Sequence, residues 1–208
     1  MSYTSIYAFN AKGETDSSVH IHNAFRGFMS VWKILEEKYL PPFRRYVPDG
    51  MSIDEHEKKF GYRPSRVTAL PTGPNYDDYS AQKEIWDLFT SPLLSHAEKI
   101  VLGTTFDRVV VKIDDVGQVI EAFRAFGGDT NLPEQAEAVE NIMAQGKFIA
   151  VAWNQTSVCG SPWYTWNEET EDMTPYNLNT GTDHYFIFDE PDLKMRDFGS
   201  DGFAIGEE

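Results

Sequence analysis

Residues 105–153 constrain the fold more than any other part of the chain, because two strand-like segments there enclose two helix-like ones. The segment TFDRVVVKI, residues 105–113, contains three consecutive valines, which favour a pleated and well-buried backbone. The segment KFIAVAW, residues 147–153, has the same character. Two strands that enclose two helices predict a β-sheet with helices packed against it.

The two helix-like segments between these strands have recognisable ends. In residues 114–128 the apolar side chains recur at helical spacing, and we expect an Asp cap at the start and Gly127 at the end. Residues 132–146 repeat the pattern, with Pro133 in the first turn and Gly146 as the stop. Both segments are therefore predicted to be amphipathic helices that cover the sheet.

The N-terminal part of the chain predicts a β-hairpin followed by a helix. Residues 3–10 and 17–23 alternate as strands do, and a polar, turn-rich connector separates them. Residues 23–42 then carry aromatic and aliphatic side chains at helical spacing, with Asn23 as the expected N-cap and a Pro-Pro pair as the stop. We interpret this aromatic stripe as core, and residues 184–189, HYFIFD, as a further strand.

These elements predict an α+β fold with a mixed or antiparallel sheet covered by three to four helices. With 208 residues, the chain is long enough to form a full core as a single domain over 1–208. We expect a long, irregular, proline-rich segment at about 41–78, with one short helix at 52–60. A flexible acidic tail is expected at about 190–208. The order of the strands is not readable from the sequence.

The charge is strongly negative and unevenly distributed. The net charge is −15, and residues 71–208 carry 8 basic against 25 acidic side chains, while residues 1–70 carry 10 against 8. Such a charge repels polyanions and favours a protein partner with a basic surface. Direct binding to nucleic acid is therefore not expected.

The chain also has sequence features that bear on location. Its first residues lack the basic start and apolar run of a signal peptide, and no later apolar run approaches the ~20 residues needed to cross a bilayer. A lone cysteine, Cys159, fits a reducing compartment. We therefore expect a cytoplasmic protein with no membrane contact.

The stretch NQTSVCGSPW, which contains Cys159, resembles the nucleophile region of the papain-like cysteine proteases over about ten residues. In that family the nucleophile is the cysteine directly before the Trp, and Pro162 holds that place here. Cys159 matches only the first cysteine of the signature. The family also needs a His and an Asn far downstream, whereas His184 is the only histidine that follows. The departures argue against protease chemistry.

Two histidines, His20 and His22, lie on the same face of an expected strand and present a usable pair of metal ligands. A third ligand is not evident in the neighbouring sequence. The simpler interpretation places both histidines on an exposed face opposite buried Val19 and Ile21. Phosphate-binding glycine loops of the GxxxxGK[ST] or GxGxxG type are absent from the sequence.

A further candidate is an aromatic loop that leads into an acidic run. Large aromatic side chains beside charged ones are typical of protein-binding hot spots, although they also fill cores under long loops. The predicted partner-binding residues are Trp163, Trp166, Glu168, Glu169, Glu171 and Asp172.

These observations favour a non-catalytic acidic binding protein without a cofactor, for example an inhibitor or immunity-type protein that masks a basic, nucleic-acid-binding surface of another protein. One alternative is a metal-dependent hydrolase that uses His20 and His22 with a divalent metal. Another is a structural or assembly subunit that forms a homo-oligomer. Whether the protein is an enzyme stays open, with the balance toward a binding role.

Overall fold

The structure is a computed structural model that describes residues 3–39, 51–60, 85, 88–89, 91–106, 108–155 and 161–189. These residues belong to two compact units. The first comprises the described residues of Met1–Val31 and Leu94–Lys194, and those of Trp32–Leu93 belong to the second. A single domain over the whole chain stays a prediction.

The first unit is built on a five-stranded sheet with the order β2-β1-β4-β3-β7. All neighbours are antiparallel except β3 and β7, which are parallel, so the sheet is mixed. The predicted α+β class with a mixed or antiparallel sheet is thus confirmed. The strands are β1 (Tyr3–Asn10), β2 (Thr15–His22), β3 (Val109–Lys112), β4 (Phe148–Asn154) and β7 (Tyr185–Phe186).

Strand β1 lies inside the sheet and is buried along its length. It pairs with β2 through the expected hairpin and with β4, where Ile6 lies opposite Trp153 and Tyr7 opposite Ala152. Because successive side chains of a strand point to opposite faces, Ile6 and Tyr7 contribute to different layers. Apolar side chains on both sides explain why β1 needs cover on both faces.

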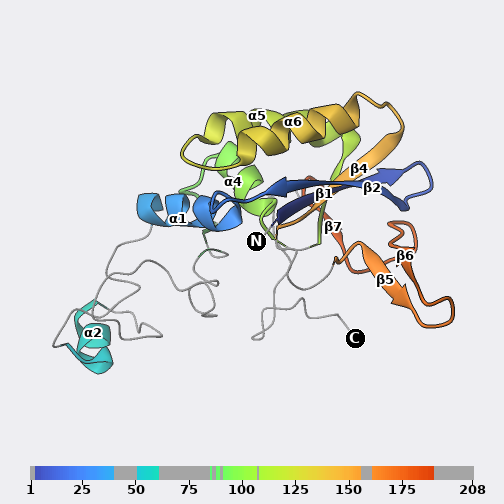
Figure 1. Cartoon of the computed structure of the whole chain (residues 1–208). Coiled ribbons are helices and arrows are strands. Elements are labelled where there is room, and N and C mark those ends of the chain that lie inside the picture. Colours follow the sequence, from blue (N-terminus) through green and yellow to red (C-terminus); the bar gives the residue numbers. More distant parts are fainter. Residues whose placement is uncertain are drawn as a thin grey trace. The chain divides into compact units, whose positions relative to one another are not determined.

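Helices cover one of these faces (Figure 1). Between the antiparallel neighbours β3 and β4, the chain forms η2 (Ile113–Asp115), α5 (Val116–Phe126) and α6 (Leu132–Met143). Helices α5 and α6 lie side by side, and α6 contacts β1, β2 and β4. Helix α4 (His96–Gly103) packs against α5. On this face the ring of Trp153 meets that of Phe123 edge to face, with the centroids 6.0 Å apart.

Aromatic side chains cover the other face. The ring of Trp163 packs edge to face on Phe9, 5.4 Å between centroids, and on Tyr176, 5.5 Å. His184 continues the series, since its ring contacts those of Tyr176 and Phe186. The buried cluster on this face comprises Tyr7, Phe9, Val110, Ala150, Ala152, Trp163 and Leu178.

The helix ends only partly follow the sequence-based expectations. Pro133 lies in the first turn of α6, as predicted, and Gly127 ends α5 with a φ of 74°, a left-handed value that glycine adopts readily. Asp115 holds the N-cap position of α5, as predicted, but its side chain makes no capping hydrogen bond. Helix α4 instead begins with a reciprocal Ser95–Glu98 capping box.

Helix α1 (Phe28–Tyr39) begins in the first unit and continues into the second. In it Trp32 and Leu35 are buried, as the interpretation of the aromatic stripe as core requires, whereas Met29 is 49% exposed and Phe25, which precedes the helix, points to solvent. The stripe is therefore only partly core. The expected N-cap is wrong, because Asn23 lies five residues before the helix begins.

The second unit also contains α2 (Ile53–Phe60), which confirms the short helix expected within the proline-rich segment. Apart from residues 51–60, the segment expected to be irregular at about 41–78 lies outside the described residues, as does the expected tail at about 190–208.

Candidate protein-binding surface

The predicted partner-binding residues fall mostly on a small hairpin made by β5 (Tyr164–Asn167) and β6 (Asp172–Pro175). These two strands form a sheet of their own, which extends beyond the five-stranded sheet in Figure 1. Trp166 lies opposite Met173 in this pairing. We call residues Tyr164–Pro175 the acidic hairpin, because they contain four carboxylates and no Lys or Arg.

The base of the acidic hairpin is fixed to the main sheet. The backbone N–H of Tyr176 donates to the carbonyl oxygen of Trp163 at 3.0 Å, and the hydroxyl of Thr15 donates to the same oxygen at 2.9 Å. The ring of Tyr164 packs on that of Tyr7, 6.1 Å between centroids. Burial, and then the nearby Tyr7 and Asp16, raise the pKa of Tyr164 above its ordinary value of 10.0.

The tip of the acidic hairpin has a defined turn. The side-chain oxygen of Asn167 accepts hydrogen bonds from the backbone N–H groups of Glu169 and Thr170, at 2.9 and 3.3 Å. Glu171 adopts a φ of 51°, a left-handed value that is uncommon for a residue other than glycine. The turn therefore holds its carboxylates on a fixed backbone.

The acidic hairpin exposes an apolar pair beside its carboxylates. Trp166 is 58% exposed and its cross-strand partner Met173 is 45% exposed. The four carboxylates are exposed, and none of them forms an ion pair with a basic side chain in the described part of the chain. They belong to Glu168, Glu169, Glu171 and Asp172. An exposed aromatic side chain surrounded by charges of one sign can bind a basic protein surface.

Trp163 differs from the other residues of the predicted set. Its side chain is 0% exposed, and its indole N–H donates to the carbonyl oxygen of Trp153 at 3.1 Å. A ring in this position stabilises the core and does not reach a partner. Of the two tryptophans expected to anchor a partner, the structure therefore leaves only Trp166 at the surface.

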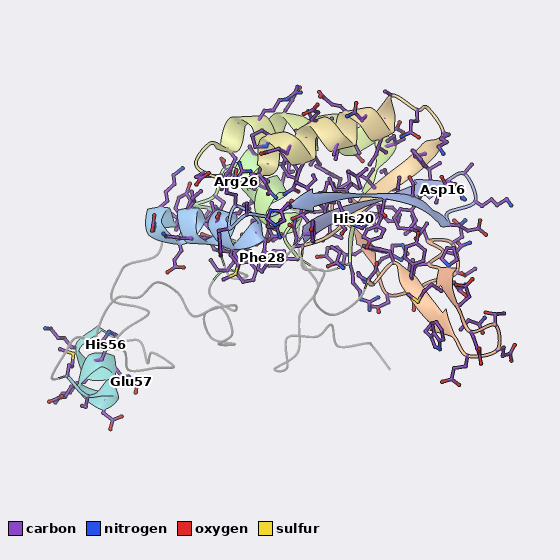
Figure 2. The ribbon with its side chains drawn as sticks, in the orientation of Figure 1. Asp16, His20, Arg26, Phe28, His56 and Glu57 are labelled. Atoms are coloured by element: carbon purple, nitrogen blue, oxygen red, sulfur yellow. The ribbon has the colours of Figure 1, made fainter. Side chains whose placement is uncertain are left out.

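His20 and His22 lie on β2, where Figure 2 labels His20. The Nδ1 atom of His20 is 2.7 Å from the Ser5 hydroxyl and its Nε2 atom is 3.3 Å from the Ser18 hydroxyl. The His22 ring packs on Tyr3 instead. Among the described residues, no three metal-ligating side chains gather at one point, so a metal at His20 and His22 stays a prediction.

The apolar side of β2 departs from the expectation. Val19, expected to be buried opposite the histidines, is 38% exposed. Ile21 is only half-buried. The reason is that β2 is an edge strand, with no neighbouring strand on its outer side in the described part of the chain.

A feature that sequence reasoning missed lies between β2 and α1. Ala24 and Phe25 both have positive φ values, 44° and 66°, and Phe25 is 99% exposed. Two consecutive left-handed residues without glycine store strain that the surrounding structure must hold. Two hydrogen bonds hold the end of this turn, since the N–H of Asn131 donates to the carbonyl of Arg26 at 2.8 Å and the Ser30 hydroxyl donates to that of Phe25 at 2.6 Å.

A buried network of polar side chains supports this turn. The side-chain oxygen of Asn23 accepts hydrogen bonds from the Thr4 hydroxyl at 2.7 Å and from the Asn131 amide at 3.0 Å. Gln135 donates to Asn131, and the Thr4 hydroxyl also lies 2.9 Å from the side-chain oxygen of Gln155, the alternative acceptor for its one proton. All five side chains are buried. Nothing in the sequence marks these residues as a set, because they come from four separate segments with polar neighbours.

No protein-family model, curated protein or solved structure matches this chain. None of the helices in the described ranges is long and apolar enough to cross a membrane. Cys159 and the rest of residues 156–160 lie outside the described residues, so the resemblance of that stretch to cysteine proteases receives no structural test.

Proposed function

We propose that the protein is a protein-binding module that docks its acidic hairpin on a basic surface of another protein. The observation that carries the proposal is the exposed Trp166–Met173 pair beside four exposed carboxylates on a hairpin without basic residues. Apolar contact provides the anchor, and the carboxylates orient the partner and speed its approach.

The charge of the whole chain supports the same assignment. Residues 71–208, which contain the hairpin, carry 8 basic against 25 acidic side chains, whereas residues 1–70 carry 10 against 8. A field of this sign raises the local concentration of a positively charged partner. The specific form that we favour is an inhibitor or immunity-type protein whose hairpin covers a basic, nucleic-acid-binding face of its target.

The test uses the full chain, immobilised, and a panel of basic nucleic-acid-binding proteins that includes ribonucleases, deoxyribonucleases and histones. Binding is measured by surface plasmon resonance. We expect at least one panel member to bind with an association rate that falls about tenfold or more between roughly 50 and 300 mM salt, because salt screens exposed charges.

Two charge-reversed variants locate the surface. One changes Glu168, Glu169, Glu171 and Asp172 to Lys. The matched control changes four exposed carboxylates elsewhere in the first unit to Lys, at Asp114, Glu121, Asp129 and Glu137. Both variants alter the net charge equally, so only a specific role of the hairpin separates them.

The expected result is that the hairpin variant and Trp166→Ala lose most of the binding while the control variant keeps most of it. Equal loss in the two charge-reversed variants would show a general charge effect and overturn the assignment to the hairpin. A panel in which no member binds would count against the basic-surface partner altogether.

A further inference from the structure

The outer edge of β2 is the least protected backbone edge of the main sheet. The sheet has two edge strands, and β7 at the other edge is only two residues long, whereas β2 has eight. The segment after β6 covers the start of β2, since the N–H of Thr15 donates to the carbonyl of Tyr176 and Glu14 forms an isolated bridge with Asn177. From residue 17 to 22, the outer edge makes no backbone hydrogen bond to any described segment.

Residues 17–22 also lack the usual protection of an edge strand. Natural edges are commonly blocked by lysine, by proline, by inward-pointing charges or by a bulge in the exposed stretch. The sequence SSVHIH contains no proline, lysine, aspartate or glutamate, and the irregularity in the β1–β2 pairing lies before it, at Asp16. Unpaired N–H and C=O groups on such a strand are a template for another strand.

We propose that this edge pairs antiparallel with the β2 strand of a second copy, so that two sheets join into one across a two-fold axis at Val19. In this register Val19 lies directly opposite Val19 of the second copy, and its side chain, which is 38% exposed, becomes buried between the two chains. Directly opposed residues lie within ~5.5 Å of one another, close enough for side-chain contact.

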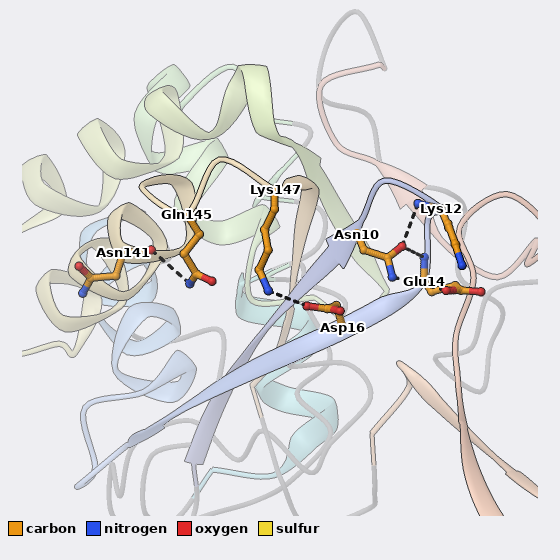
Figure 3. Close-up of polar contacts among 7 residues, drawn as sticks. All are labelled: Asn10, Lys12, Glu14, Asp16, Asn141, Gln145 and Lys147. Carbon is orange, nitrogen blue, oxygen red and sulfur yellow. Dashed lines mark hydrogen bonds and ion pairs between the residues drawn. The ribbon is translucent and has the colours of Figure 1, made fainter.

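The register is self-complementary. With Val19 at the axis, Ser18 lies opposite His20 of the second copy, and Asp16 lies opposite His22. The Asp16 carboxylate thus faces an imidazole on each side of the axis, and the Ser18 hydroxyl, which lies 3.3 Å from Nε2 of His20 in its own chain, lies beside a second imidazole. Asp16, which Figure 2 shows on the same strand as His20, keeps its ion pair with Lys147 at 3.1 Å on the near side (Figure 3).

Neighbouring registers are less suitable. An axis at Ser18 requires the outer edge at Glu14, which the bridge to Asn177 already occupies. An axis at His20 places two imidazoles against each other and leaves Asp16 without an opposite residue on β2. The Val19 register pairs residues 17–21 within the open part of the edge, and only its outermost pair, Asp16 with His22, reaches the irregularity at Asp16.

The first experiment is sedimentation equilibrium of the full chain at about 1 to 200 µM, because the population of a dimer follows the protomer concentration. We expect a concentration-dependent rise from 23.7 kDa toward twice that mass. The variant Val19→Lys places like charges directly opposite each other at the axis and should raise the dimer dissociation constant by about tenfold or more. The variant Val19→Thr, which keeps the branched shape, is the matched control.

A second experiment tests which residues of the two β2 strands lie opposite each other. Its result does not depend on how well Val19→Lys folds. In a Cys159→Ser background, Val19→Cys should form an intermolecular disulfide under mild oxidation, since directly opposed Cα atoms lie within the ~4.4–6.8 Å that a disulfide needs. Ser17→Cys and Ile21→Cys should each stay uncrosslinked alone and crosslink when mixed.

The outcomes are distinct. A monomer at every concentration would overturn the proposal. A dimer that is equally stable in Val19→Lys, or one that crosslinks through other positions but not through Val19→Cys, would place the interface elsewhere and overturn it too. Neither result bears on the acidic hairpin, because the tests of the two proposals use different residues and different partners.

Discussion

The turn between β2 and α1 allows a quantitative test through Asn23 and Gly27. Asn23 is buried, and its side-chain oxygen is the acceptor for both the Thr4 hydroxyl and the Asn131 amide. Replacing Asn23 by Ala leaves the buried Asn131 donor without this acceptor, whereas Thr4 still has Gln155. We expect the free energy of unfolding to fall by about 2 to 4 kcal/mol, mainly from the unsatisfied donor.

Gly27 is constrained by the same side chain. A Cβ atom at Gly27 would lie 2.7 Å from Cγ and 2.8 Å from Oδ1 of Asn23. Hydrogen bonds fix the Asn23 side chain, so it cannot move aside without losing them. We expect Gly27→Ala to destabilise the protein by about 1 to 3 kcal/mol through overpacking.

The double variant Asn23→Ala/Gly27→Ala distinguishes a steric clash between these two positions from two independent losses of stability. Asn23→Ala removes Cγ and both amide atoms, so a methyl group at Gly27 then meets no clash with them. The double variant should be about as stable as Asn23→Ala alone, which corresponds to a coupling energy of roughly 1 to 3 kcal/mol. Urea unfolding followed by circular dichroism gives all four free energies. Penalties that add to within ~0.5 kcal/mol would refute the geometry of this turn.

Three further predictions concern other parts of the first unit. Trp163→Ala should lower the free energy of unfolding by about 3 to 5 kcal/mol, and Trp166→Ala should change it by no more than about 0.5 kcal/mol, because only the ring of Trp163 is buried. Chemical denaturation measures both values, and similar losses would contradict the burial assigned to the two rings. Ser95→Ala, which removes a capping box, should lower the midpoint of thermal unfolding through a loss of about 1 kcal/mol, and no change would contradict the cap. The raised pKa of Tyr164 means that its neutral form is favoured in the folded state. Its contribution to the stability of the fold is therefore present below pH ~10 and is lost as the pH rises through the folded-state pKa. The difference in phenolate absorbance between the wild type and Tyr164→Phe should therefore appear at a higher pH than the phenolate absorbance of free tyrosine. Its appearance at a lower pH would contradict the burial of Tyr164.

The sequence predicted the elements better than their arrangement. The valines of β3 and the amphipathic pattern of α5 and α6 are local signals, and the corresponding elements formed where expected. The pairing of β1 with β4 joins Ser5 to Asn154 across most of the chain, and neither strand carries a mark that identifies the other. The order of the strands in the sheet therefore depends on side-chain packing between distant segments, which the hydrophobic periodicity of a single segment does not reveal.

The candidate site shows the same limit at the level of single residues. Trp163 and Trp166 lie three positions apart, and their types do not say which ring points inward. The choice is made by Phe9, which comes from the first strand of the chain, and by Tyr176, which follows the hairpin; both rings pack on Trp163. Asn23 resembled an N-cap because it precedes an apolar run, but its side chain is needed by Thr4 and Asn131 instead.

The position of β1 has a consequence for synthesis in the cell. One edge of β1 needs β4 as its neighbour, and one face needs the ring of Trp163, and both partners are encoded at residue 148 or later. At a translation rate of about 5 to 20 residues per second, the ribosome takes roughly 7 to 30 s to reach them after β1 has been made. During this interval β1 is paired with β2 on one edge only and one of its apolar faces is uncovered, so the nascent chain should depend on chaperones that bind exposed apolar strands.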